Sequence, residues 1–178
     1  SREEFVRNML KSGEVTAERK AWLDVSRKTM DDFSLFLAEV VHAANENTKI
    51  GLMTSDPRQH MLEARDWKTI LSNFSQNGDV IDRIHLPAYL EDVPKKYYWR
   101  FHCISVQTRA FMPDDAKIYP ELENISFSPF AKNSRFLKYQ VESSLPLVLN
   151  GMTYDIFDFV SNGAIDEYGY GEVLSEIT

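Results

Sequence analysis

The chain has little cysteine and no long apolar run, and each shortage excludes a class of protein. Its 178 residues contain one cysteine, Cys103, which rules out an intramolecular disulfide framework and any zinc site built from cysteines. No apolar run approaches the ~20 residues that a membrane-spanning helix needs. The polar residues 1–4 are unlike a signal peptide, and with the single cysteine they favour a cytoplasmic location.

Positive charge is also scarce. Lys and Arg number 20 against 27 Asp and Glu, which gives a net charge of −7 and a pI near 5.1. No basic cluster stands clear of acids, so neither a nucleic acid nor an anionic membrane is an expected partner. A metal-ligand cluster, a Ser-His-Asp elbow and a P-loop are missing as well, and we expect no metal or other cofactor.

What is present is the composition of one ordinary globular domain over residues 1–178, at 43% hydrophobic and 12% aromatic residues. Three- and four-residue spacing of apolar side chains predicts helices. They cover residues 2–11, 17–45, 67–76, 96–111 and 134–150. The helix over 17–45 has a stripe that should face the core. The stripe contains Trp22, Val25, Thr29, Phe33, Phe36, Leu37, Val40, Val41 and Ala44.

Strands are expected at 49–55, 80–87, 115–124 and 152–159, with a helix between each pair. This alternation predicts an α/β fold with parallel strands and right-handed crossovers. An open doubly wound sheet and part of a (β/α)8 barrel both fit, but the glycine fingerprint for phosphate is absent after every strand, which favours the barrel. Four units make half a barrel with open edges, so the chain should join the rest of a barrel or form a homo-oligomer.

The third strand segment places two carboxylates on one side. Because side chains alternate along a strand, Tyr119, Glu121 and Glu123 share one face. Two like charges so close need a cation, a hydrogen-bond network or a substrate if they are buried. The plain alternative is a strand whose acids lie in solvent.

Four short motifs resemble the second half of the catalytic barrel of clan A glycoside hydrolases, nearest to β-galactosidase-like proteins akin to family 42. They are Ile-Gly-Leu-Met-Thr-Ser at 50–55, His-x-x-Glu-x-Arg-Asp-Trp at 60–67, Tyr-Pro-Glu-Leu-Glu-Asn at 119–124 and Ile-Phe-Asp at 156–158. The resemblance makes the strands five to eight of a TIM-type barrel. It also implies that the clan's acid/base glutamate precedes residue 1.

By this resemblance the chain is a retaining β-glycosidase fragment that acts on a carbohydrate and carries the nucleophile. The interval from Lys117 to Glu123 is similar to the clan's seventh strand and implies Glu123 as nucleophile, while the displaced Pro120 leaves Glu121 as the alternative. Retaining hydrolysis needs carboxyl groups about 5–5.5 Å apart. Glu121 and Glu123 are ~7 Å apart along the strand, so we expect Glu121 to be a deeper group that is either paired with Arg83 or hydrogen-bonded.

Further substrate contacts are expected from residues in or near strand ends. They are Arg83, His85, Trp67, Tyr119, Asp155 and Asp158. An ordinary packing role is the alternative for His85, Trp67 and Tyr119. If the chain is an enzyme, Ser55, Arg83, Glu123 and Asp155 should converge at the carboxyl ends of the strands. The rival function is a non-catalytic β/α domain that binds a carbohydrate or a protein.

Overall fold

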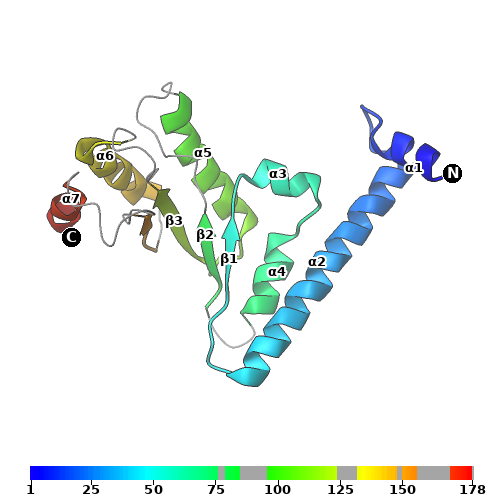
Figure 1. The fold of residues 1–178 in the computed structure, drawn as a ribbon, viewed down its shortest axis with the longest axis horizontal. Helices are drawn as coiled ribbons and strands as arrows, with labels where there is room; N and C mark the ends of the chain where they lie inside the picture. Colours follow the sequence, from blue (N-terminus) through cyan, green and yellow to red (C-terminus); the bar gives the residue numbers. More distant parts are fainter. Residues whose placement is uncertain (76–78, 85–95, 124–131, 148–149, 156–168, 178) are drawn as a thin grey trace, which may run out of the picture.

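The computed structural model describes residues 1–75, 79–84, 96–123, 132–147, 150–155 and 169–177, with 96–98, 123 and 155 described by backbone alone. Within these residues the fold is α/β (Figure 1). The helices are α1 (Arg2–Met9), α2 (Ala17–Ala44), α3 (Pro57–Leu62), α4 (Trp67–Phe74), α5 (Lys96–Phe111), α6 (Ser134–Ser144), the 3-10 turn η1 (Leu145–Leu147) and α7 (Tyr170–Ile177). The strands are β1 (Gly51–Thr54), β2 (Ile81–Ile84), β3 (Lys117–Glu123) and β4 (Thr153–Asp155).

The four strands form one parallel sheet in the order β1-β2-β3-β4. Each pair of neighbours in the sheet is also consecutive along the chain, and at least one helix lies between them in sequence. The expected alternation of strand and helix, the parallel pairing and the sequential order are therefore confirmed. In Figure 1, α2 and α4 lie toward the β1 edge of the sheet, and α6 and α7 lie toward the opposite edge.

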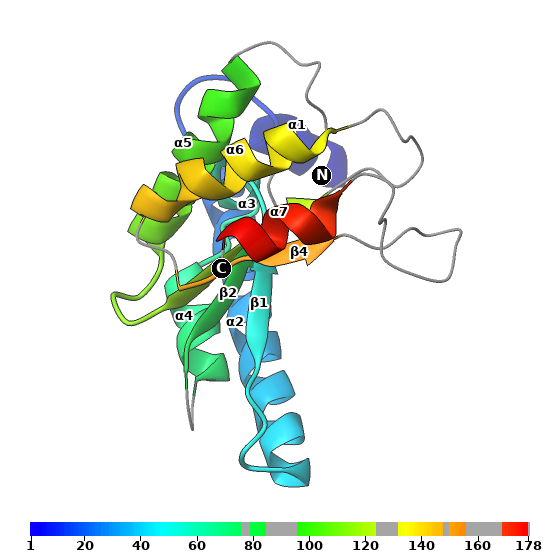
Figure 2. The same ribbon diagram turned by 90° about the vertical axis from the view of Figure 1, so that its left-hand side faces the viewer.

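The two faces of the sheet differ, because side chains alternate along each strand. Even-numbered residues such as Ile84, Ile118 and Leu122 are fully buried and pack in one cluster with side chains of α4, α5, α6 and α7. Odd-numbered residues point to the other face, where Met53 is 69% exposed. Figure 2 shows α6 and α7 in front of the sheet when the molecule is turned by 90°.

Polar residues fix the starts of the helices. Asp66 accepts a hydrogen bond from the backbone N–H of Thr69 and begins α4, as expected. Asp56 does the same for α3 with Pro57 in the first turn, so part of residues 58–65, expected to be a loop, is helical. The cap of α6 is Asn133 and not Ser134, and the helix ends at Ser144 before the turn η1.

The prediction that the apolar stripe of α2 faces the core is wrong. Its largest members are about half exposed: Trp22 49%, Val25 64%, Phe33 50%, Phe36 57% and Val40 51%. The buried residues are the small Ser34 and Ala38, which allow α2 to approach α4 closely. The side chain of Asn73 on α4 donates to Ser34 Oγ at 2.8 Å and to the backbone oxygen of Asp31 at 3.1 Å, which fixes this contact.

Helix α5 shows the same kind of difference. Trp99 and Val106, which share one side of the helix, are 69% and 58% exposed, whereas Phe101, Ile104 and Thr108 are buried. Both sets have helical spacing, so periodicity alone does not separate them. None of the described helices has the length and apolar character needed to cross a membrane.

Candidate active site at the carboxyl ends of the strands

The carboxyl ends of parallel strands meet at one edge of a sheet, where α/β proteins commonly bind ligands. Here the strands end at Thr54, Ile84, Glu123 and Asp155. Four of the predicted site positions, Arg83, Glu121, Glu123 and Asp155, lie within two residues of these ends on three consecutive strands. The topology thus gathers acidic and basic residues along one part of the edge.

Arg83 and Glu121 form an ion pair on the odd-numbered face of the sheet. We call it the open face, because the described helices pack against the even-numbered face. The register sets Arg83 opposite Tyr119, so Glu121 lies two residues nearer the carboxyl end and Arg83 reaches forward to it. The Glu121 side chain is 5% exposed and that of Arg83 is 30% exposed. Nη1 of Arg83 also donates to Sδ of Met53 at 3.0 Å. The expected pairing of Glu121 with Arg83 is confirmed, and it supplies the cation that a buried carboxylate needs.

Glu123 and Asp155 face each other as the last residue pair between β3 and β4. Neighbouring strands lie ~4.8 Å apart, so these two acidic positions adjoin. Ser55 follows β1, which is two strands from β3, or ~10 Å across the sheet. The structure therefore brings Glu123 beside Asp155 and Glu121 beside Arg83, and it sets Ser55 at the edge of the group.

Tyr119 is half-buried on the open face, next to the chain that enters β4. A Cβ atom at Gly151 would lie 3.0 Å from Cδ1 and Cε1 of the Tyr119 ring. The ring thus rests on the backbone at Gly151, which only glycine permits at this distance. Tyr119 helps to fix β4 against β3, in agreement with the packing alternative.

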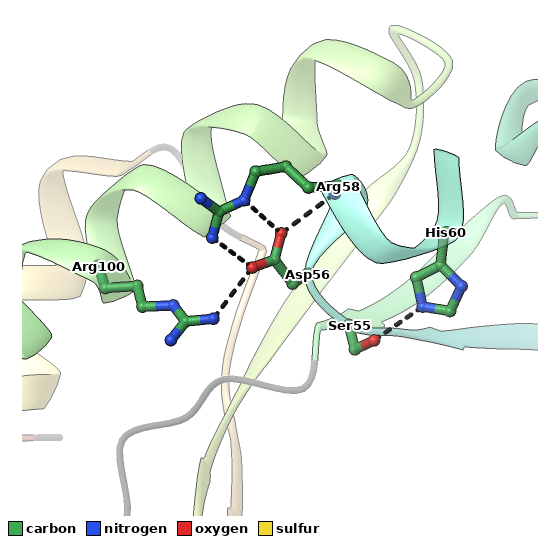
Figure 3. A network of polar contacts seen from close by, with 5 residues as sticks. All are labelled: Ser55, Asp56, Arg58, His60 and Arg100. Atoms are coloured by element: carbon green, nitrogen blue, oxygen red, sulfur yellow. Dashed lines mark hydrogen bonds and ion pairs between the residues drawn. The ribbon is translucent and has the colours of Figure 1, made fainter. Parts of the chain in front are cut away.

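A second polar cluster follows β1 (Figure 3). Asp56 is 7% exposed and accepts hydrogen bonds from the backbone N–H and the guanidinium of Arg58, and from Nη2 of Arg100 at 3.0 Å. These bonds, led by those from Arg58, hold the pKa of Asp56 well below its usual range. Because Arg100 belongs to α5, Asp56 ties the start of α3 to α5.

Ser55 makes the other contact of this cluster: its Oγ lies 2.7 Å from Nε2 of His60 (Figure 3). Burial, followed by the charge of Arg65, lowers the pKa of His60, so its ring is neutral at pH 7. Sequence reasoning missed His60 and Arg100 as partners of Ser55 and Asp56. Arg100 is 44 residues from Asp56, and no local pattern signals such a pair.

Trp67 lies on the helix-covered side and not on the open face. It is 5% exposed, belongs to the main core, and its ring centroid is 5.3 Å from that of His60. The ordinary packing alternative describes this residue, and we leave it out of the proposed substrate contacts. His85 and Asp158, also expected to contact substrate, lie outside the described residues.

Asp82 was not expected to matter, yet it is the most enclosed carboxyl group in the described part of the chain. It is fully buried on the helix-covered face, where Thr54 Oγ1 donates to its Oδ2 at 3.0 Å. Oδ1 has no hydrogen-bond partner among the described residues. Burial raises the pKa of Asp82 to about 7, against the opposing effect of the Thr54 hydrogen bond. The sequence does contain a signal for this residue: Asp82 is an acidic residue at an even-numbered strand position, between Ile81 and Ile84, where the alternation of side chains predicts burial.

Fold and site together define an α/β protein with sequential parallel strands and a charged carboxyl edge. In the described part of the chain, no three His, Cys, Asp or Glu side chains are grouped so that they could hold a metal ion. Comparison with protein-family models, with curated proteins and with solved structures found no match in any of the three.

Proposed function

We propose that this chain is the carboxyl-terminal half of a (β/α)8 barrel of a retaining glycoside hydrolase, with Glu123 as the nucleophile. The observation that carries the proposal is the arrangement of the carboxyl groups on β3. Glu121 is neutralised by Arg83, and Glu123 ends the same strand beside Asp155. One carboxylate is thus committed to an ion pair, while the other occupies the strand end where barrel enzymes carry catalytic groups.

The sheet supports the barrel part of the proposal. A barrel strand faces helices on one side and a lumen on the other, and the even- and odd-numbered positions here differ in that sense. Sequential parallel order is the order of barrel strands, whereas a doubly wound sheet has a switch point. The remaining strands would come from the rest of a barrel or from another subunit.

The mechanism assigns one role to each group. Glu123 attacks the anomeric carbon of the sugar, and a glycosyl ester forms as the leaving oxygen departs; water then releases the sugar. Arg83 keeps Glu121 ionised and turned away from the sugar, so it does not compete as nucleophile. Asp155 lies on the neighbouring strand, where it contacts a sugar hydroxyl. The proton donor is the acid/base glutamate that the resemblance assigns to a preceding segment.

An activated fluorosugar tests the nucleophile without the proton donor. The complete barrel protein that contains this chain is incubated with 2,4-dinitrophenyl 2-deoxy-2-fluoro-β-galactoside, whose leaving group departs unprotonated, and the product is analysed by intact mass and peptide mapping. We expect one fluorogalactosyl group on Glu123, and none on the Glu123→Gln variant. The matched control Glu121→Gln should still be labelled.

The outcomes separate the possible errors. A label on Glu121 would mean that the nucleophile lies two residues earlier in the same strand, with the enzyme class unchanged. If neither glutamate carried a label, the hydrolase proposal would be refuted in favour of a β/α domain that binds sugar or protein without turnover.

A further inference from the structure

We infer that two copies of this chain associate through α2, whose most apolar face is not covered by any described element. The inference does not rest on the proposed hydrolase activity. In Figure 1, α2 forms one flank of the molecule, with α4 on its inner side and α1 at its outer end. The uncovered face consists of Trp22, Val25, Phe33, Phe36 and Val40, each 49–64% exposed, and we call it the α2 stripe.

The stripe is continuous and distinct from the face that packs on α4. At ~100° per residue its five side chains fall within a sector of about 80°. The residues that pack toward α4, among them Met30, Ser34 and Ala38, are centred about 140° further round the helix. Five large apolar side chains in one row about 27 Å long are typical of a helix–helix interface and not of scattered surface residues.

The stripe is complementary to itself when a second α2 runs antiparallel. If the twofold axis passes near residue 31, Trp22 of one chain meets Val40 of the partner subunit, and Val25 meets Phe36 of the partner subunit. A hollow of about 440 Å³ adjoins Trp22 and Val25, lined also by Met30 of α2 and by Glu63 and Arg65 of the loop between α3 and α4. In this pairing the partner subunit's Phe33, which is exposed in the single chain, lies opposite Thr29 at the rim of the hollow.

Charge selects the same direction. Lys28 and Asp32 flank the stripe on one side and form an exposed ion pair, with Nζ 2.7 Å from Oδ2. In the antiparallel pairing, Lys28 of each chain lies opposite Asp32 of the partner subunit. Each ion pair within a chain can then be replaced by one between the chains, and no like charges meet. A parallel pairing sets these charges against the other flank, where Glu63 and Arg65 already form an ion pair with each other.

The contact is small. Two helices that meet over about 27 Å bury less than the ~1,200 Å² of a standard interface, so we expect a dissociation constant in the micromolar range. Sedimentation equilibrium from about 1 to 200 µM should show a mass that rises from 20.6 kDa toward twice that value. A mass that stays monomeric over the whole range would overturn the inference.

Matched variants locate the contact. Phe36→Lys places a charge within the stripe, opposite Val25 of the partner subunit, and should weaken association at least 100-fold. Asp24→Lys, at a side chain 50% exposed and about 140° round the helix from the stripe, should leave it unchanged. Both positions are exposed, and circular dichroism verifies that each variant is folded. Association that survives Phe36→Lys, or that is lost equally in both variants, refutes the α2 stripe as the interface.

Cross-linking tests the direction of the helices. In a Cys103→Ser background, chains with Thr29→Cys and chains with Phe33→Cys, distinguished by a tag, are mixed and oxidised. The antiparallel pairing brings Thr29 of one chain to Phe33 of the partner subunit, so the mixed disulfide should dominate. Predominant disulfides between identical variants would show a parallel pairing and overturn the proposed arrangement.

Discussion

Asp82 offers the sharpest test of the packing, because its carboxyl group is fully buried between the sheet and the helices. Only one hydrogen bond, from Thr54, reaches it among the described residues. A carboxylate in such a place loses its hydration without a paired cation, so the protonated form is favoured. We therefore predict that Asp82→Asn, which mimics the neutral acid in size and shape, stabilises the protein at neutral and higher pH.

The size of the effect follows from the pKa of Asp82, which rises from 3.8 to about 7 on folding. The folded state binds the proton more tightly, so this group's stabilising contribution is fully present below pH 3.8 and is lost as the pH rises to about 7. At 1.36 kcal/mol per pKa unit the total loss is about 4 kcal/mol. Asp82→Asn should therefore match the wild type near pH 4 and exceed its free energy of unfolding by several kcal/mol at pH 8.

Urea unfolding followed by tryptophan fluorescence at intervals from pH 4 to pH 8 measures this difference. Asp79→Asn is the matched control, because Asp79 pairs with Lys117 and Lys49 and its pKa is lowered. Asp79→Asn should be less stable than the wild type at pH values above the ordinary pKa of Asp79. Its effect on the free energy of unfolding therefore has the opposite sign to that of Asp82→Asn. A constant difference between wild type and Asp82→Asn across the pH range would show that Asp82 is solvated or paired, and the argument would fail.

Two further predictions concern the other buried carboxylates. Arg83→Leu leaves Glu121 buried without its cation and should lower the free energy of unfolding by about 3–5 kcal/mol; an unchanged urea midpoint would mean that the pair contributes nothing. Asp56→Asn removes the charge that Arg58 and Arg100 share and should cost about 1.5–3 kcal/mol at pH 7. Because the pKa of Asp56 is lowered on folding, this cost should shrink as the pH falls below about 4, and a cost independent of pH would contradict it.

The order of the strands was predictable because it follows from local signals. Each strand segment is apolar, short and bounded by turn residues, and a helix-length segment separates it from the next. Right-handed crossovers then leave few ways to assemble the sheet, and sequential parallel order is the simplest. The ion pair of Arg83 with Glu121 was also predictable from local signals, because both residues are odd-numbered and lie on adjacent strands.

The buried faces of the helices were not predictable in the same way. Helix α2 has two rows at helical spacing, one of large apolar residues and one with Ser34 and Ala38. Hydrophobicity favours the first row, but close approach to α4 selects the second, and that preference depends on a partner that periodicity does not describe. The contacts of Asp56 with Arg100 and of Ser55 with His60 likewise depend on how the helices are set on the sheet.

Asp82 and Glu121 show that the face of the sheet on which a carboxyl group lies determines its partner and its protonation. Both are buried on adjacent strands, and both would be costly as isolated charges. Glu121 is odd-numbered, faces the open side of the sheet and finds the guanidinium of Arg83. Asp82 is even-numbered, faces the helices and finds a hydroxyl, so it keeps its proton until about neutral pH. The proposed nucleophile must stay ionised, and Glu123 is the next odd-numbered position after Glu121 toward the carboxyl edge of β3.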